Sequence, residues 1–207
     1  MTDVAPIPED RRVIEVIEKL AITPTLQAWL ILVWLKIKPV TVSDEIIPVS
    51  ICGTIRSIGF WVIEDGIGLD GCIFSLERSL AEALERYFLE HRKGLGSFFE
   101  NNYRIGNLLG FPETAVRAYS ECSFHEFKKM KMLLLNANEL PSEVCRADFM
   151  AFCNFRLSRA NWRAELETVK GWAGKIREFS PRIYQSVVER FRFEVVPELD
   201  SDCEDED

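Results

Sequence analysis

The stretch Thr23-Pro24-Thr25-Leu26-Gln27-Ala28-Trp29-Leu30-Ile31-Leu32-Val33-Trp34-Leu35 contains the longest apolar run of the chain, at residues 28–35. A threonine followed by a proline is typical of a helix N-cap with proline in the first helical position. Lys36 and Lys38 precede Pro39, where the helical pattern stops. The run is too short for a membrane-spanning helix, which needs about 20 apolar residues. We therefore predict a buried helix, apolar on nearly all sides, at the centre of the core.

Composition and charge predict one folded domain with an acidic tail. The chain has 207 residues, of which 47% are hydrophobic and 28% are charged, as in ordinary globular proteins. Seven of its 33 acids lie in Glu198–Asp207, which leaves 26 acids against 25 bases in the rest. This segment has too few apolar residues to fold, so we expect a single α+β domain over residues 1–197 and a disordered tail over 198–207. Six irregularly spaced cysteines and the lack of a leader pattern indicate a cytoplasmic protein.

The fold class that we expect is mostly helical α+β with a small antiparallel sheet built around a β-hairpin. Phe60–Glu64 and Cys72–Leu76 are strand-like runs on either side of a glycine-bearing connector, which favours a hairpin. Phe149–Phe155 suits a third strand. The segment Val40–Ser50 is ambiguous, and Ser50–Ile58 fits a short helix or an irregular turn.

Helices are expected wherever apolar residues recur at spacings of three and four. The clearest stripe runs from Trp162 through Ile176, and a last helix should begin at Ser180-Pro181. Three Ser-x-x-Glu capping boxes predict further helix starts. They are Ser79 with Glu82, Ser97 with Glu100, and Ser123 with Glu126.

The glycines of the hairpin connector, Gly66–Gly71, match the G-x-G-x-x-G spelling of dinucleotide-binding loops. That fingerprint needs a helix to begin within the glycines. Here the β-favouring run Cys72-Ile73-Phe74 follows instead, so we interpret the segment as a hairpin turn. No cofactor is expected.

Cysteines and histidines offer a candidate metal or thiol site. Cys122 and His125 are three residues apart, and Cys145 and Cys153 follow them. The second pair lacks the close spacing of structural zinc sites, so we predict no metal and interpret these cysteines as small buried groups. A cysteine nucleophile paired with a histidine base is a weaker alternative for Cys122 or Cys145. Whether the four residues converge in space does not follow from the sequence.

Basic residues gather in the C-terminal third, where Cys145–Arg192 carries ten bases and five acids. Arg156, Arg159 and Arg163 follow at spacings of three and four, so a helix here would align them on one ridge that contacts phosphates. The alternative is a solvated face whose counter-charge is the acidic tail. No base-reading signature accompanies these residues, so the sequence does not choose among nucleic acid, another polyanion and a protein as the partner. No association with a membrane is predicted.

The stretch Ile105–Tyr119, with Leu108-Leu109-Gly110-Phe111-Pro112 at its centre, resembles the L-L-G-Y-P-x-C-C-V-x-x-F segment of an uncharacterised, mainly archaeal family, domain of unknown function family 483. The order of a helical pair ending in Lys38-Pro39, a hairpin with a helix, and a late strand with a helix is also similar. The resemblance implies a related fold and an archaeal cytoplasmic source. Thr114 and Ala115 stand where the family pattern has a cysteine pair, so no metal or redox role comes with it. The family has no established activity to transfer.

The residues of this stretch also have a direct physical interpretation. Gly110 should end one helix in a left-handed conformation, Phe111 should be extended, and Pro112 should open the next helix. The amides of Glu113, Thr114 and Ala115 could then receive an anion. Two functions follow as hypotheses, first a non-catalytic binding or accessory protein that uses the basic third, and second an enzyme acting on a small anionic ligand at this corner. A single pocket lined by both the corner and the arginines favours the second.

Overall fold

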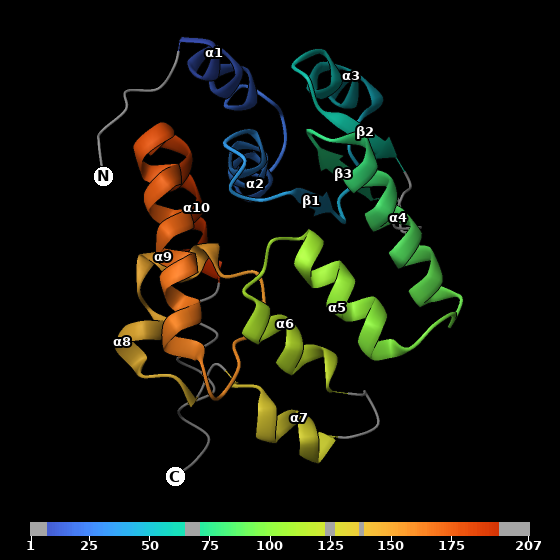
Figure 1. Ribbon diagram of the computed structural model, residues 1–207. Coiled ribbons are helices and arrows are strands. Elements are labelled where there is room, and N and C mark those ends of the chain that lie inside the picture. The colour runs from blue at the N-terminus through green and yellow to red at the C-terminus, as the bar shows by residue number, and fades with distance from the viewer. Residues whose placement is uncertain (1–7, 65–70, 123–126, 137–138, 195–207) are drawn as a thin grey trace.

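The computed structural model describes residues 8–64, 71–122, 127–136 and 139–194. Helix α2 (Pro24–Trp34) lies between α9 (Trp162–Phe179) and α10 (Pro181–Glu194) on one side and a small sheet on the other (Figure 1). The hydroxyl of Thr23 accepts a hydrogen bond from the amide of Leu26 at 3.4 Å, and every residue from Leu26 to Val33 is buried. The predicted central helix is confirmed. None of the helices in the described parts of the chain is long and apolar enough to cross a bilayer.

The sheet has three antiparallel strands in the order β1, β3, β2. Strands β2 (Trp61–Glu64) and β3 (Cys72–Ser75) form the predicted hairpin, with Val62 opposite Phe74. Residues 65–70, which include most of the glycine-rich connector, lie outside the described residues. The mostly helical α+β class with a small antiparallel sheet is therefore confirmed.

The third strand is not where the sequence predicts it. Strand β1 (Val40–Ser43) pairs with β3, whereas Phe149–Phe155 forms the 3-10 helix η2 (Asp148–Phe152) and an irregular segment after it. The ring of Phe152 stacks at 5.4 Å on Tyr184 of α10. The aromatic residues that favoured a strand are thus buried against helices, because β-propensity reflects a need for burial that a helical neighbour also satisfies.

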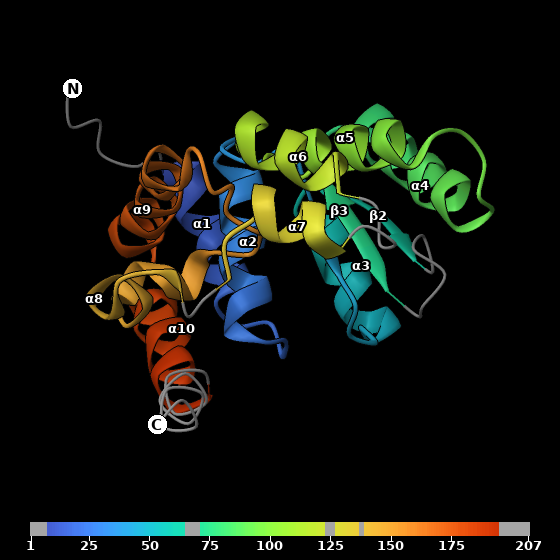
Figure 2. The same ribbon diagram turned by 90° about the horizontal axis from the view of Figure 1, so that it is seen from below.

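Helices cover both faces of the sheet. On one face, Phe74 belongs to the main core with α2 and with α3 (Val49–Ser57). On the other, Ile73 and Val40 form a second apolar cluster with α4 (Arg78–Arg92) and α5 (Phe98–Leu108). Figure 2 shows α3 and α5 on opposite sides of the strands. The alternation of side chains along β3 therefore joins two cores through one central strand.

The predicted helix starts have different outcomes. Ser97 caps α5, since its hydroxyl accepts from the amide of Glu100 at 3.0 Å. The helix predicted at Ser79 forms as α4, but Ser79 is not its cap, because the helix already begins at Arg78 and the Glu82 carboxylate pairs with Arg78 at 2.6 Å. The predicted cap at residues 123–126 lies outside the described residues.

The remaining helices complete the covering layers. Helix α9 buries the predicted stripe, and α10 begins at Pro181 as expected. The others are α1 (Pro8–Ile17), α6 (Glu113–Ser120), α7 (Phe127–Leu133) and α8 (Ser142–Cys145).

Candidate functional site

The corner between α5 and α6 has the predicted geometry. Gly110 adopts a left-handed φ of 73°, its amide bonds the carbonyl of Asn107, and the amide of Phe111 bonds the carbonyl of Gly106. This pair of bonds is the Schellman motif, in which glycine avoids the strain that a side chain would meet. Helix α6 begins at Glu113, one residue later than predicted, with Pro112 as the preceding cap. The corner directs the ring of Phe111 back toward the rest of the molecule.

A cleft of about 620 Å³ adjoins this corner. Its volume lies in the range of small-molecule sites, and apolar groups form most of its exposed walls. The walls come from α4, α5, α6, the corner and the segment after η2. The lining residues are Phe88, His91, Asn102, Ile105, Gly106, Leu109, Phe111, Ala115, Val116, Tyr119, Cys153, Asn154, Phe155 and Arg156.

Four of the residues singled out by sequence line this cleft, namely Phe111, Ala115, Cys153 and Arg156. Phe111 of the corner and Arg156 of the basic third both line it, although they are far apart in the chain. The rings of Phe111 and Phe155 contact each other with centroids 5.4 Å apart, which joins the corner to the segment that carries Arg156. The other predicted residues, Gly110, Pro112, Glu113, Thr114, Arg159 and Arg163, are not part of its lining.

Arg156 brings the cleft its positive charge. Among the described residues its guanidinium contacts the Sδ of Met130 at 3.5 Å and pairs with no carboxylate. Its charge is therefore free to meet an anion from solution.

Behind the Phe111 wall of the cleft lies the amine of Lys38. Lys38 is 1% exposed and lies in the short segment between α2 and Pro39. Its Nζ lies 4.1 Å from the ring centroid of Trp172, 4.7 Å from that of Phe111 and 5.2 Å from that of Trp29. This arrangement, which we call the aromatic cage, holds an Nζ with no hydrogen-bond partner among the described residues.

Burial lowers the pKa of Lys38 from 10.5 to about 7, because the charged amine has lost its water shell. The electron-rich ring faces attract the cation and oppose this shift, by about 0.5–2 kcal/mol for each ring. Desolvation is the larger effect, since no acceptor or carboxylate replaces the lost water. The amine is thus present in large part as the neutral, nucleophilic form near neutral pH.

A buried carboxylate braces the walls of the cleft. Glu165 of α9 is 1% exposed and accepts hydrogen bonds from the Thr114 hydroxyl at 2.7 Å and from the amide and hydroxyl of Ser158 at 2.7 and 2.5 Å. Three donors make it a satisfied buried charge. The Thr114 hydroxyl therefore serves a carboxylate of its own chain, and the Glu113 carboxylate pairs with Arg117 at 3.2 Å.

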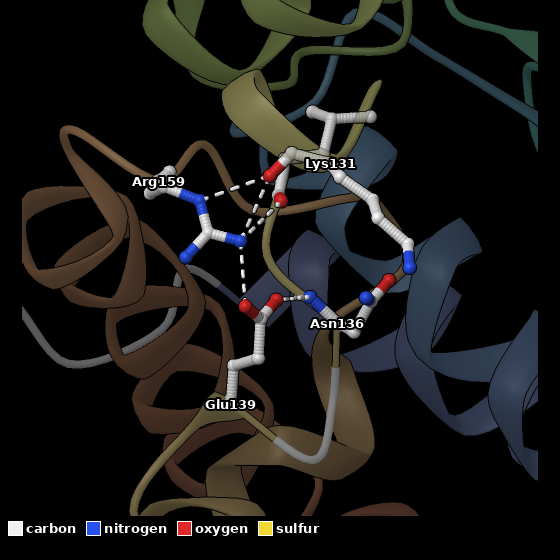
Figure 3. Close-up of polar contacts among 5 residues, drawn as sticks. Lys131, Asn136, Glu139 and Arg159 are labelled. Carbon is white, nitrogen blue, oxygen red and sulfur yellow. Dashed lines mark hydrogen bonds and ion pairs between the residues drawn. The ribbon is translucent and has the colours of Figure 1, made fainter. Parts of the chain in front are cut away.

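The predicted arginine ridge does not form. Helix α9 begins at Trp162, so Arg156 and Arg159 lie in an irregular segment before it and the three side chains share no helical face. Arg159 donates to the carbonyl of Lys131 and to the Glu139 carboxylate (Figure 3), and also to the carbonyl of Leu134. These hydrogen bonds tie Arg159 to residues 131, 134 and 139.

Glu139 and Arg163 each have a local contact that accounts for their charge. The Asn136 amide, followed by the Arg159 guanidinium, lowers the pKa of Glu139. The guanidinium of Arg163 lies over the ring of the adjacent Trp162, 4.2 Å from its centroid. Helical spacing does not align the three arginines, because α9 begins only at Trp162 and Arg159 is held by hydrogen bonds to residues 131, 134 and 139.

Half of the bases in the basic C-terminal third pair with nearby acids. Five of its ten bases pair with carboxylates at 2.5–2.7 Å, in the pairs Arg159–Glu139, Lys170–Glu167, Lys175–Glu178, Arg190–Glu194 and Arg192–Asp148. Two of these acids, Glu139 and Glu194, lie outside the segment Cys145–Arg192, for which ten bases and five acids were counted. The counter-charges therefore come from the folded domain, and the acidic tail lies outside the described residues.

Of the cysteines considered as metal or thiol candidates, Cys122 and Cys145 are buried and Cys153 is partly buried. The thiols of Cys122, Cys145 and Cys153 donate to carbonyls of Ala118, Leu140 and Phe155. Burial raises the pKa of Cys153 to about 11, which makes it a poor nucleophile although it lines the cleft. Within the described residues no group of three or more His, Cys, Asp or Glu side chains is arranged to hold a metal ion, and His125 lies outside them.

Sequence reasoning did not assign Lys38, Glu165 or Phe155 to a site. Lys38 was identified only as part of a helix stop, and a lysine after an apolar run does not show whether its amine reaches solvent. The one signal in the sequence is the adjoining Pro39. In the fold this proline packs against the corner, since a Cβ on Gly110 would lie 2.9 Å from the Cδ of Pro39. The Lys-Pro pair and the glycine-proline corner thus contact each other in the fold.

Comparison with known proteins identifies no relative. No family model, no curated protein and no solved structure matches the chain. The resemblance of Ile105–Tyr119 to domain of unknown function family 483 therefore stays a prediction.

Proposed function

We propose that the protein binds a small ligand with an aromatic or apolar body and one anionic group, and that this ligand occupies the cleft beside the α5–α6 corner. The observation that carries the proposal is the meeting of Phe111 and Arg156 in one cleft of about 620 Å³. The sequence predicts that a pocket lined by both the corner and the arginines favours an enzyme acting on a small anionic ligand, and one of the three arginines lines this cleft. Metal and cofactor play no part in this proposal.

The walls support the aromatic or apolar part of the ligand. Phe88, Phe111, Tyr119 and Phe155 present rings to a cleft whose exposed surface is mostly apolar. Aromatic rings prefer offset-stacked or edge-on ring neighbours. A flat apolar group that packs on them also displaces water from their surface, which is favourable. A ligand ring between these walls would gain both contributions.

The charge supports the anionic part. Arg156 lines the cleft and has no carboxylate partner among the described residues. A guanidinium can bind a carboxylate or phosphate through two parallel hydrogen bonds. Such a charged contact in a partly apolar site contributes about 1.5–3 kcal/mol, or roughly tenfold to a hundredfold in affinity.

Biphenyl-4-carboxylate tests the proposal, because it combines two rings with one anion. Titration followed by protein NMR should give saturable shifts, and Arg156→Ala should weaken binding at least tenfold. Arg163→Ala is the matched control, since this arginine belongs to the same basic third but does not line the cleft. The neutral biphenyl-4-carboxamide should lose little on Arg156→Ala. Equal losses in both variants, or no saturation at millimolar concentration, would overturn the proposal.

The polyanion hypothesis has less support from the same geometry, since five of the ten bases already pair with acids. It predicts that removal of Glu198–Asp207 tightens binding to RNA or DNA and that log affinity falls with log salt. If full-length and truncated chains both ignore nucleic acid at low salt, the hypothesis fails.

A further inference from the structure

The aromatic cage places a nucleophile directly behind the cleft. The Nζ of Lys38 lies 4.7 Å from the ring centroid of Phe111, and the same ring lines the cleft. Phe111 is partly buried, and its neighbour in the cleft wall is Phe155. The Phe111 ring therefore contacts both the amine and the space that the proposed ligand occupies.

The amine in the aromatic cage has no hydrogen-bond or ion-pair partner among the described residues. Rings of Trp29, Phe111 and Trp172 surround Nζ, and no described acceptor or carboxylate bonds it. A buried polar group without a partner is costly and needs a reason. Desolvated lysines are the amines that proteins use to form imines with carbonyl compounds, because burial leaves the amine uncharged and nucleophilic.

We propose that the Lys38 amine forms an imine with an aldehyde or ketone held in the cleft, after the Phe111 ring turns aside. This inference rests on the proposed function and gives its ligand a chemical class, a carbonyl compound with an aromatic or apolar body and an anionic group. Arg156 binds the anionic group, and the cage receives the carbonyl carbon.

The chemistry needs no further reagent. The nitrogen lone pair attacks the carbonyl carbon, and the C=O bond opens to a carbinolamine. The oxygen then leaves as water with the two amine hydrogens, while a C=N bond forms. No atom is oxidised or reduced, and hydrolysis by one water molecule reverses the step and restores the amine.

Reductive trapping with 4′-formylbiphenyl-4-carboxylate tests the inference on the full chain. At pH 7.5 with sodium cyanoborohydride, an imine becomes a stable secondary amine that peptide mass mapping locates. Lys36 is exposed and two residues away, so it reports on non-specific labelling. At this pH about one in a thousand surface lysines is neutral. We expect Lys38 to react at least tenfold faster than Lys36, with a rate that saturates as the aldehyde concentration rises.

Two variants distinguish a site from a merely reactive core lysine. Phe111→Leu removes the ring that contacts both the amine and the cleft, so the trapping rate should rise at least threefold. Arg156→Ala should raise the half-saturating aldehyde concentration at least tenfold while the maximal rate stays the same. Labelling of Lys36 without labelling of Lys38, in the native chain and in Phe111→Leu, would overturn the inference.

The analogue 4′-methylbiphenyl-4-carboxylate separates this inference from the proposed function, because it cannot form an imine. If it binds and no Lys38 adduct forms, the cleft still binds anions of this class and the imine proposal is wrong. If neither analogue nor aldehyde binds, both proposals are wrong.

Discussion

Replacement of the buried amine by an apolar group of similar length is the sharpest test of the aromatic cage. Lys38→Met keeps the stem that packs among the rings and removes the unpartnered Nζ. Unfolding returns the lysine to water, where its pKa is 10.5, whereas in the folded protein burial holds it at about 7. The folded state therefore carries a cost for the charged amine that the variant lacks.

The magnitude follows from these two values. A difference between 10.5 and about 7 corresponds to about 5 kcal/mol, at about 1.4 kcal/mol per pH unit. The folded-state pKa of about 7 already reflects every contact of the amine in the folded protein. We therefore expect Lys38→Met to raise the free energy of unfolding at pH 7 by about 4–5 kcal/mol.

The sign of the pH dependence is equally specific. The pKa is lower in the folded state, so the unfolded chain binds more protons between about pH 7 and 10.5. Stability of the unmodified protein should therefore rise with pH in this window. Below pH 7 both states are charged, and the cost stays constant. The advantage of the variant should thus shrink to about 1 kcal/mol or less by pH 10.

Urea denaturation at pH 6, 7, 8, 9 and 10 measures this difference, with the free energy of unfolding of each protein compared at the same pH. Lys36→Met is the matched control, because Lys36 is exposed, and its effect should not change with pH. A Lys38→Met protein that is less stable than the parent at pH 7, or a difference that stays constant from pH 7 to 10, would refute the reasoning.

Three further predictions concern the walls of the cleft and the sheet beside it. Glu165→Gln should lower the free energy of unfolding by about 2–4 kcal/mol, since the amide cannot accept all three hydrogen bonds of the carboxylate; exposed Glu167→Gln should change it little in the same urea experiment. Gly106→Ala should lower the free energy of unfolding by about 1–2 kcal/mol, because a Cβ there would lie 2.8 Å from both methyl carbons of Val116 on α6. Gly174→Ala, where a Cβ meets no atom within 4 Å, should raise the free energy of unfolding slightly. The Cys72 thiol, whose pKa burial raises to about 12, should stay unmodified by a thiol reagent at pH 8 in the native protein and react on unfolding. Rapid labelling of native Cys72 would show that this face of the sheet opens.

Elements with strong local signals were predictable from the sequence. The buried helix Pro24–Trp34, the hairpin of β2 and β3, the Ser97 cap and the Gly110 corner all form as their residues indicate. Each depends on residues close together in the chain, such as a capping hydroxyl, a glycine that accepts positive φ, or an apolar run bounded by a turn. Such signals act over one turn of chain and do not need the rest of the molecule.

Partners distant in sequence decided the rest. The residues Val40–Ser43 became the third strand because β3 offers them a free edge, while Phe149–Phe155 packed its rings against helices. Both segments have the side chains of a strand. The pairing of β1 depends on a partner more than 25 residues away, and local propensity cannot choose among such partners.

The candidate site shows the same division between local and distant information. The sequence alone determined that Phe111 would stand at a glycine-proline corner and that Arg156 would carry a positive charge. Only the tertiary structure brought both to one cleft, committed Arg159 to Glu139, and enclosed Lys38 among rings from α2, the corner and α9. The physical reason is that burial and desolvation are properties of the surroundings. A lysine has the same composition in water and in an aromatic cage, but only the second environment makes its amine neutral near pH 7.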